Sequence, residues 1–229
     1  VPPGRYLTAV RMFEAKKLLV TSSMTVCDIV YSIGYNSVGT FTSRFRRTVG
    51  MSPRQYRCPD VERLLVAASN RYSRMPSLGE LSCSLRQVTA TCPTALTGTL
   101  RGVVELPHHS PGTNVLVGVY REAIPQQTPV AHLVLPAQRS TRFTLSGVPV
   151  GQWTVMAIAM PAGTSANCAG VLVGSPPGRV TVNAHTDART QFTMRHLSST
   201  DAPIAVTLAR TPVAGPQLGV DHMPALALS

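Results

Sequence analysis

The sequence predicts an α+β fold in two segments, an all-α N-terminal segment followed by an antiparallel β-sandwich. Residues 1–57 repeat apolar side chains at helical spacing, whereas the chain from residue 97 onward consists of short strand-like runs separated by Pro and Gly. Charge is also uneven: the 229-residue chain carries a net +11, and residues 1–57 hold nine basic and two acidic side chains. We expect a partial helix-turn-helix domain over 1–57, a linker over 58–96 and a β-sandwich domain over 97–229.

The helical segment opens with a long apolar stripe. Its members are Leu7, Val10, Ala15, Leu18 and Leu19. Pro2 and Pro3 stand where a helix can begin, because a proline in the first turn gives up no intrahelical hydrogen bond. Ser22 and Ser23 interrupt the pattern, so the first helix is expected to end before them.

Two short helices are expected next. Thr25 is a candidate N-cap with Asp28 completing a capping box, and Gly34 supplies a left-handed turn residue after the apolar run. That run, at the spacing of one buried helix face, is Val26, Ile29, Val30 and Ile33. Ser37 can cap the second helix, which extends to about Val49.

Phe41 and Phe45 lie one above the other on the inner face of this second helix. Gly50 ends the helix and Pro53 prevents its continuation. Two short helices joined by a tight turn containing Gly describe a helix-turn-helix. Spacing alone leaves open whether the pair binds DNA or is an ordinary helical hairpin of a small bundle.

The second segment has a different period. Its strand-like runs are Thr99–Glu105, Asn114–Arg121, Val130–Leu135, Thr141–Leu145, Gln152–Met160, Gly170–Val173, Arg179–Ala184, Arg189–Arg195 and Ile204–Ala209. Short strands at regular spacing, without helical patterns between them, favour an antiparallel sandwich. Residues 58–96 fit neither pattern: Val61 to Ser69 is expected to extend the helical part, and the rest to be irregular.

Ordered motifs run through the first 57 residues. They are Tyr6-Leu7-x-x-x-Arg11-x-x-x-Ala15-x-x-Leu18-Leu19, Val26-x-Asp28-Ile29, Ile33-Gly34-Tyr35-Asn36-Ser37, Phe41-x-x-x-Phe45-Arg46 and Gly50-Met51-Ser52-Pro53-x-x-Tyr56-Arg57. In order and spacing this set closely resembles the C-terminal signature of AraC/XylS-type transcriptional regulators. That family joins two helix-turn-helix units by a long helix. Residues 1–20 resemble the end of the first unit plus the joining helix, so we expect the rest of the first unit to lie outside the chain.

The resemblance implies that the helix from Ser37 to Val49 enters a major groove with its N-terminus first. The residues that would face the bases are Val38, Gly39, Thr40 and Ser43. The residues that would meet phosphates are Ser37, Arg44, Arg46, Arg47 and Arg54. None of the base-facing side chains can make a bidentate contact, so Thr40 and Ser43 would offer single hydrogen bonds and Val38 a methyl contact.

Double-stranded DNA is therefore the expected partner of a bacterial-type regulator, and RNA polymerase is a further candidate. The β half resembles transthyretin-like and carboxypeptidase-regulatory-like sandwiches in Val117-Gly118-Val119-Tyr120, Phe143-x-Leu145 and Val148-Pro149-x-Gly151. Its partner, an effector or a protein, is not identified by that resemblance. The alternative is a truncated interaction module that acts through the β-sandwich and binds no DNA.

Catalytic motifs are not found. The sequence has no Gly-rich phosphate loop, no Gly-x-Ser-x-Gly elbow and no His-Glu-x-x-His, so we expect neither an enzyme nor a cofactor. The adjacent His108 and His109 point to opposite faces if they lie on a strand, which disfavours a shared metal. Five widely spaced cysteines favour a reducing cytoplasm, and no apolar run reaches the roughly 20 residues that span a bilayer.

Overall fold

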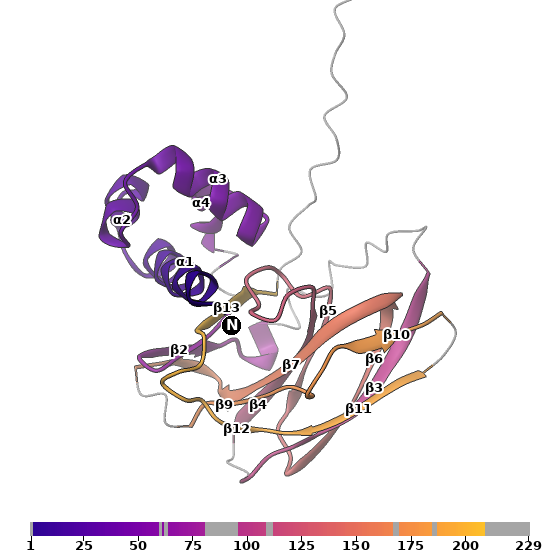
Figure 1. The fold of residues 1–229 in the computed structure, drawn as a ribbon. Helices are drawn as coiled ribbons and strands as arrows, with labels where there is room; N and C mark the ends of the chain where they lie inside the picture. Colours follow the sequence, from indigo (N-terminus) through magenta and orange to yellow (C-terminus); the bar gives the residue numbers. More distant parts are fainter. Residues whose placement is uncertain are drawn as a thin grey trace, which may run out of the picture.

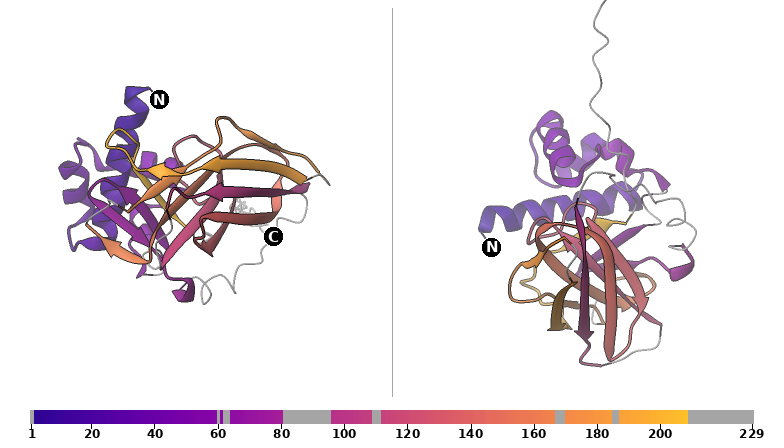
Figure 2. Two further views of the ribbon diagram at one scale, coloured as in Figure 1. Left: turned by 90° about the horizontal axis from the view of Figure 1, so that it is seen from below. Right: turned by 90° about the vertical axis from the view of Figure 1, so that its right-hand side faces the viewer.

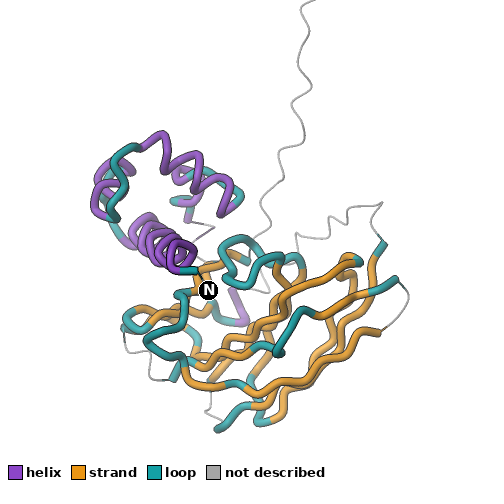
Figure 3. The backbone as a smooth tube through the Cα atoms, in the orientation of Figure 1, coloured by secondary structure: helices purple, strands orange, loops and turns teal. Residues whose placement is uncertain are grey.

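A computed structural model describes residues 2–59, 61, 64–80, 96–108, 112–166, 170–184 and 187–208. The helices gather at one end of the molecule and the strands fill the rest (Figure 1). The helices are α1 (Pro3–Thr21), α2 (Val26–Ser32), α3 (Val38–Val49) and α4 (Pro53–Tyr56). The predicted segregation of an all-α segment from a strand-rich segment is confirmed, as the tube in Figure 3 shows by colour. None of the helices within the described ranges is long and apolar enough to cross a membrane.

The predicted helix ends are confirmed. Thr25 and Asp28 form a reciprocal capping box at the start of α2, and the Ser37 hydroxyl accepts a hydrogen bond from the Thr40 backbone N–H at the start of α3. Gly34, between these helices, has φ +81°, and Gly50, at the end of α3, has φ +90°. Both angles are left-handed, which glycine adopts without steric cost.

Thirteen strands lie among the described residues. They are β1 (Leu65–Ser69), β2 (Tyr72–Met75), β3 (Thr97–Glu105), β4 (Thr113–Tyr120), β5 (Ala131–Pro136), β6 (Ser140–Pro149), β7 (Gly151–Pro161), β8 (Gly163–Ser165), β9 (Leu172–Gly174), β10 (Val180–Val182), β11 (Asp187–Thr193), β12 (Arg195–His196) and β13 (Ile204–Thr207). They form one sheet in the order β13-β1-β2-β8, a central sheet in the order β12-β9-β7-β4-β5 with β10 also paired to β7, and a third sheet in the order β11-β3-β6.

The three sheets stack on one another through β4, which is buried on both faces. Val115, Val117 and Val119 point into a core shared with Leu100 of β3 and Phe143 of β6. The alternate side chains of β4 point the other way. Leu116 and Tyr120 join a second core with Val66 of β1 and Val206 of β13. The expected sandwich of the central and third sheets is thus present, and a further sheet covers its other side.

The helices pack on the outer face of the β13-β1-β2-β8 sheet. Leu65, Ala67 and Ala205 belong to the same hydrophobic core as Phe13 and Leu19 of α1. Both views of Figure 2 show α1 lying across one end of the strand-rich part. Helices and strands therefore share buried surface rather than meeting only through a connecting segment.

The helix expected from Val61 to Ser69 is wrong from Leu65 onward, although Val61 itself is helical. β1 forms there instead, pairs with β13 over four residues from Leu65↔Thr207 to Ala68↔Ile204, and continues through a turn into β2. A short apolar run buried on both faces lacks the alternation of a half-exposed strand, so its periodicity does not separate strand from helix. Where the domains divide stays a prediction, but the proposed linker contains two strands of a core sheet.

A second departure concerns strand direction. Among the strand pairs of the described residues, β3 and β11 run parallel, in register from Asp187↔Thr99 to Thr193↔Glu105, whereas the other pairs are antiparallel. The chain builds most of the central sheet between these two strands, so the link between them is a long crossover. A tight hairpin would have forced them to be antiparallel.

Candidate nucleic-acid interface

The outer face of α3 presents most of the residues predicted to meet bases. Gly39, Thr40 and Ser43 are exposed, as a groove contact requires. Val38 is only half-exposed, since its side chain packs against the helical core. It therefore has less free surface for a thymine methyl than the sequence suggested.

The predicted phosphate contacts lie at the edges of the same surface. Arg44, Arg46, Arg47 and Arg54 are all exposed, and none forms an ion pair within the described residues. Ser37 uses its hydroxyl to cap α3, so the oxygen already accepts one hydrogen bond. Its hydroxyl proton remains available to donate to an anion.

Aromatic side chains hold α3 in place from below. Phe41 and Phe45 are fully buried, with ring centroids 5.4 Å apart. Tyr35 meets Phe41 edge-on at 5.3 Å, and Tyr56 of α4 meets Phe45 edge-on at 5.5 Å. These contacts fix the rotation of α3 about its axis, and with it the set of side chains that faces outward.

The turn between α2 and α3 is fixed by a side chain of α1. The Arg11 guanidinium lies 5.4 Å from the centroid of the Tyr35 ring. A Cβ added at Gly34 would come within 3.2 Å of the same guanidinium. Arg11 thus packs over the turn. This contact explains why the motifs of residues 1–57 include Arg11, which lies on α1 rather than on α2 or α3.

Two of the arginines have a second environment that sequence reasoning missed. Arg44 and Arg47 line a cavity of about 590 Å³ together with Arg5 of α1 and the loop from residue 121 to 130, which joins β4 to β5. The Gln127 side chain of that loop donates a 3.1 Å hydrogen bond from Nε2 to the Arg47 carbonyl. Gln127 lies 80 residues from Arg47 along the chain, and no local pattern signals such a contact.

The described residues offer no set of side chains that could bind a metal ion. The His108 ring stacks on the His196 ring with centroids 5.2 Å apart, while His109 lies outside the described residues. Groups of three or more His, Cys, Asp or Glu side chains suited to a metal are absent from the described part of the chain.

Comparison with known proteins gives matches to the helical segment. Residues 1–58 match the family model described as "Helix-turn-helix domain". The HTH-type transcriptional activator RhaS of Escherichia coli O139:H28 (strain E24377A / ETEC) is 40% identical over 57 residues, which is 25% of this chain and 20% of RhaS. The melibiose operon regulatory protein of Escherichia coli (strain K12) is 40% identical over 53 residues, 23% of this chain and 18% of that protein.

The chain thus spans about a fifth of the length of the curated relatives that it matches. The shared region is the four-helix segment that carries α3, and the strands from β1 onward lie outside it. Residues 1–58 therefore carry a helix-turn-helix domain similar to those of AraC-type transcriptional regulators.

Proposed function

We propose that this chain is a sequence-specific DNA-binding transcriptional regulator of the AraC/XylS type, and that its β-rich half senses a ligand or binds a protein partner. The observation that carries the proposal is the outer face of α3. Its exposed Gly39, Thr40 and Ser43 are bordered by arginines that have no ion-pair partner among the described residues.

The proposed division of labour follows from side-chain reach and charge. The guanidinium groups of four arginines meet phosphates and orient the domain on the duplex without reading sequence. They are Arg44, Arg46, Arg47 and Arg54. Thr40 and Ser43 are short, and each reads one base edge with a single hydrogen bond. Gly39 has no side chain, which lets the α3 backbone approach the bases closely.

The proposal also includes properties of a whole regulator that the helix-turn-helix domain by itself does not determine. Contact with RNA polymerase, a cytoplasmic location and the role of the β half are parts of the proposal, because the family match lies within residues 1–58. The truncated interaction module remains the second candidate. The hydrogen bond from Gln127 to the Arg47 carbonyl favours it, since this contact places the β4–β5 loop against one end of α3.

Selection from a random duplex library tests the proposal. The chain should enrich a short motif, and Thr40→Ala should relax one position of that motif while leaving the others intact. Thr21→Ala is the matched control, because Thr21 is also an exposed threonine but its hydroxyl bonds the Lys17 carbonyl within α1. If the chain bound duplexes but enriched no motif, its DNA binding would be nonspecific, which would contradict the proposal of sequence-specific binding. Absence of duplex binding would favour the interaction module.

A further inference from the structure

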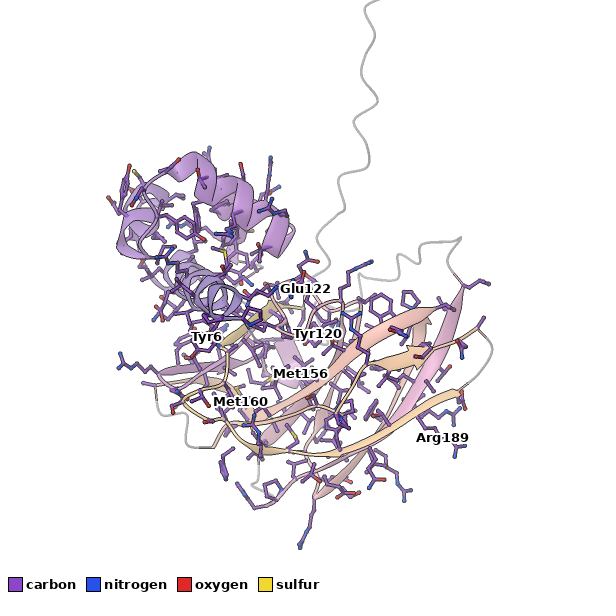
Figure 4. All side chains as sticks on the ribbon, viewed as in Figure 1. Tyr6, Tyr120, Glu122, Met156, Met160 and Arg189 are labelled. Carbon is purple, nitrogen blue, oxygen red and sulfur yellow. The ribbon has the colours of Figure 1, made fainter. Side chains whose placement is uncertain are left out.

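A cavity of about 590 Å³ lies where the helices meet the strands. Its walls are the N-terminal part of α1, the C-terminal part of α3 and the β4–β5 loop. Figure 4 shows Tyr120 and Glu122, which both line it, at this junction. The volume falls within the range of about 300–1,000 Å³ that is typical of small-molecule sites.

The wall contributed by the helices is cationic. Arg5 comes from α1, and Arg44 and Arg47 come from α3, and none of the three has an ion-pair partner among the described residues. Arg121 also lines the cavity, with its guanidinium 5.5 Å from the Trp153 ring centroid. Of the side chains that the structure describes, Glu122 is the one carboxylate that lines the cavity. Three unpaired guanidinium groups around one space favour a ligand that carries a carboxylate or a phosphate.

The β4–β5 loop contributes apolar side chains to the cavity. Ile124 and Val130 line this side. The Gln126 side-chain amide is buried, and neither its Oε1 nor its Nε2 has a hydrogen-bond partner among the described residues. The apolar side chains of this loop favour a ligand whose body is apolar.

The loop that forms this wall is attached to both helices. The Gln126 carbonyl accepts a 2.5 Å hydrogen bond from Lys16 Nζ of α1, and Gln127 Nε2 donates to the Arg47 carbonyl of α3. The cavity is therefore bounded by fixed elements.

We propose that this cavity binds a small organic anion, with an apolar body against Ile124 and Val130 and a carboxylate or phosphate among Arg5, Arg44 and Arg47. The bound anion weakens DNA binding, because Arg44 and Arg47 cannot serve the anion and the DNA phosphates at once. This second step, the coupling, rests on the proposed function. The binding of the anion does not.

Calorimetry with three probes of similar size tests the site. Phenyl phosphate and phenylacetate are anionic, and phenylethanol is their uncharged counterpart. At least one anion should bind the intact chain about tenfold or more tightly than phenylethanol, because a hydrogen bond to a charged group contributes about 1.5–3 kcal/mol. Comparing the two anions identifies which head group the arginines prefer. Equal binding of all three probes, or none, would overturn the site.

Two arginine variants locate the binding. Arg5→Ala removes a guanidinium that lines the cavity, whereas Arg46→Ala removes an exposed arginine of α3 that does not line it. Arg5→Ala should weaken anion binding about tenfold, and Arg46→Ala should leave it unchanged. Circular dichroism checks that both variants keep their helices. Equal losses in the two variants would show a diffuse charge effect and overturn the assignment.

The coupling is measured separately, as the affinity for a short duplex with and without saturating anion. The anion should weaken duplex binding about tenfold in the intact chain and less in Arg5→Ala. An unchanged duplex affinity with the anion bound would overturn the coupling. If no duplex bound while the anion still depended on Arg5, the proposed function would fail and the anion site would stand.

Discussion

The Nζ atom of Lys16 on α1 donates a 2.6 Å hydrogen bond to the carbonyl oxygen of Ala205 on β13, 189 residues further along the chain. Lys16 is 1% exposed, and its Nζ also lies 5.9 Å from the centroid of the Tyr56 ring. Burial lowers the pKa of Lys16 from its ordinary 10.5 to about 7. One buried amine thus joins the helix-turn-helix segment to the sheet beneath it.

Stability should therefore depend on pH through Lys16. Between pH 7 and 10.5 the unfolded chain keeps a proton that the folded chain has released, so the free energy of unfolding rises with pH across this window. Below it both states are protonated, and the folded state bears the full cost of the buried charge. Lys16→Met should remove this dependence, and the difference in slope between wild type and variant should approach about 1.4 kcal/mol per pH unit. Urea titrations at several pH values measure it, and parallel curves for the two proteins would contradict the burial of Lys16.

Helices and sandwich should unfold together. The single tryptophan, Trp153, is packed in the core between the central and third sheets, so its fluorescence reports on strands, whereas circular dichroism at helical wavelengths reports on α1 to α4. Because the helices share a core with β1 and β13, both signals should follow one urea transition. A helical transition well before the fluorescence change would show two independent domains.

The turn between α2 and α3 should tolerate no side chain. Gly34→Ala should destabilise the chain by about 1–2 kcal/mol, because φ at Gly34 is +81° and the new Cβ would crowd Arg11. Gly4→Ala is the matched control, since Gly4 lies in α1 with nothing within 4 Å of an added Cβ. Chemical denaturation should show that Gly4→Ala is neutral or stabilising. Equal losses for both variants would contradict the left-handed geometry of this turn.

The residues of α3 that contact phosphates and those that read bases should respond differently to mutation. Arg46→Ala should weaken binding to all duplexes alike and reduce the salt dependence by about one phosphate contact, whereas Thr40→Ala should change preference at one base pair by about 1 kcal/mol. Arg46 is preferred to Arg44 here because Arg44 also lines the cavity. Competition between a selected duplex and its scrambled form measures both effects. A change of base preference in Arg46→Ala, with only a salt effect in Thr40→Ala, would reverse the assigned faces.

Local signals predicted much of this fold. Thr25, Gly34, Ser37 and Gly50 marked the helix boundaries that the structure has, because caps and left-handed glycines act within a few residues. β6 was visible for the same kind of reason, since its buried and exposed side chains alternate from Ser140 to Leu145. The assignment of base-facing and phosphate-facing residues stays a prediction.

Contacts between residues far apart in the chain could not be predicted from the sequence. β1 is an apolar run whose strand form depends on β13, which lies about 140 residues away. Lys16 was one of the nine basic residues counted in residues 1–57, but it is buried because the β4–β5 loop and β13 close over it. The cavity beside Arg44 and Arg47 arises from the same loop, so no spacing within residues 1–57 could reveal it.

The salt dependence of duplex binding by this chain tests the central claim most directly. If Arg44, Arg46, Arg47 and Arg54 meet phosphates, the logarithm of the binding constant should fall linearly with the logarithm of salt concentration, with a slope between about −2 and −4. Replacing all four arginines by alanine should bring that slope close to zero. A wild-type slope near zero, or an unchanged slope in the fourfold variant, would contradict the account that this surface binds DNA.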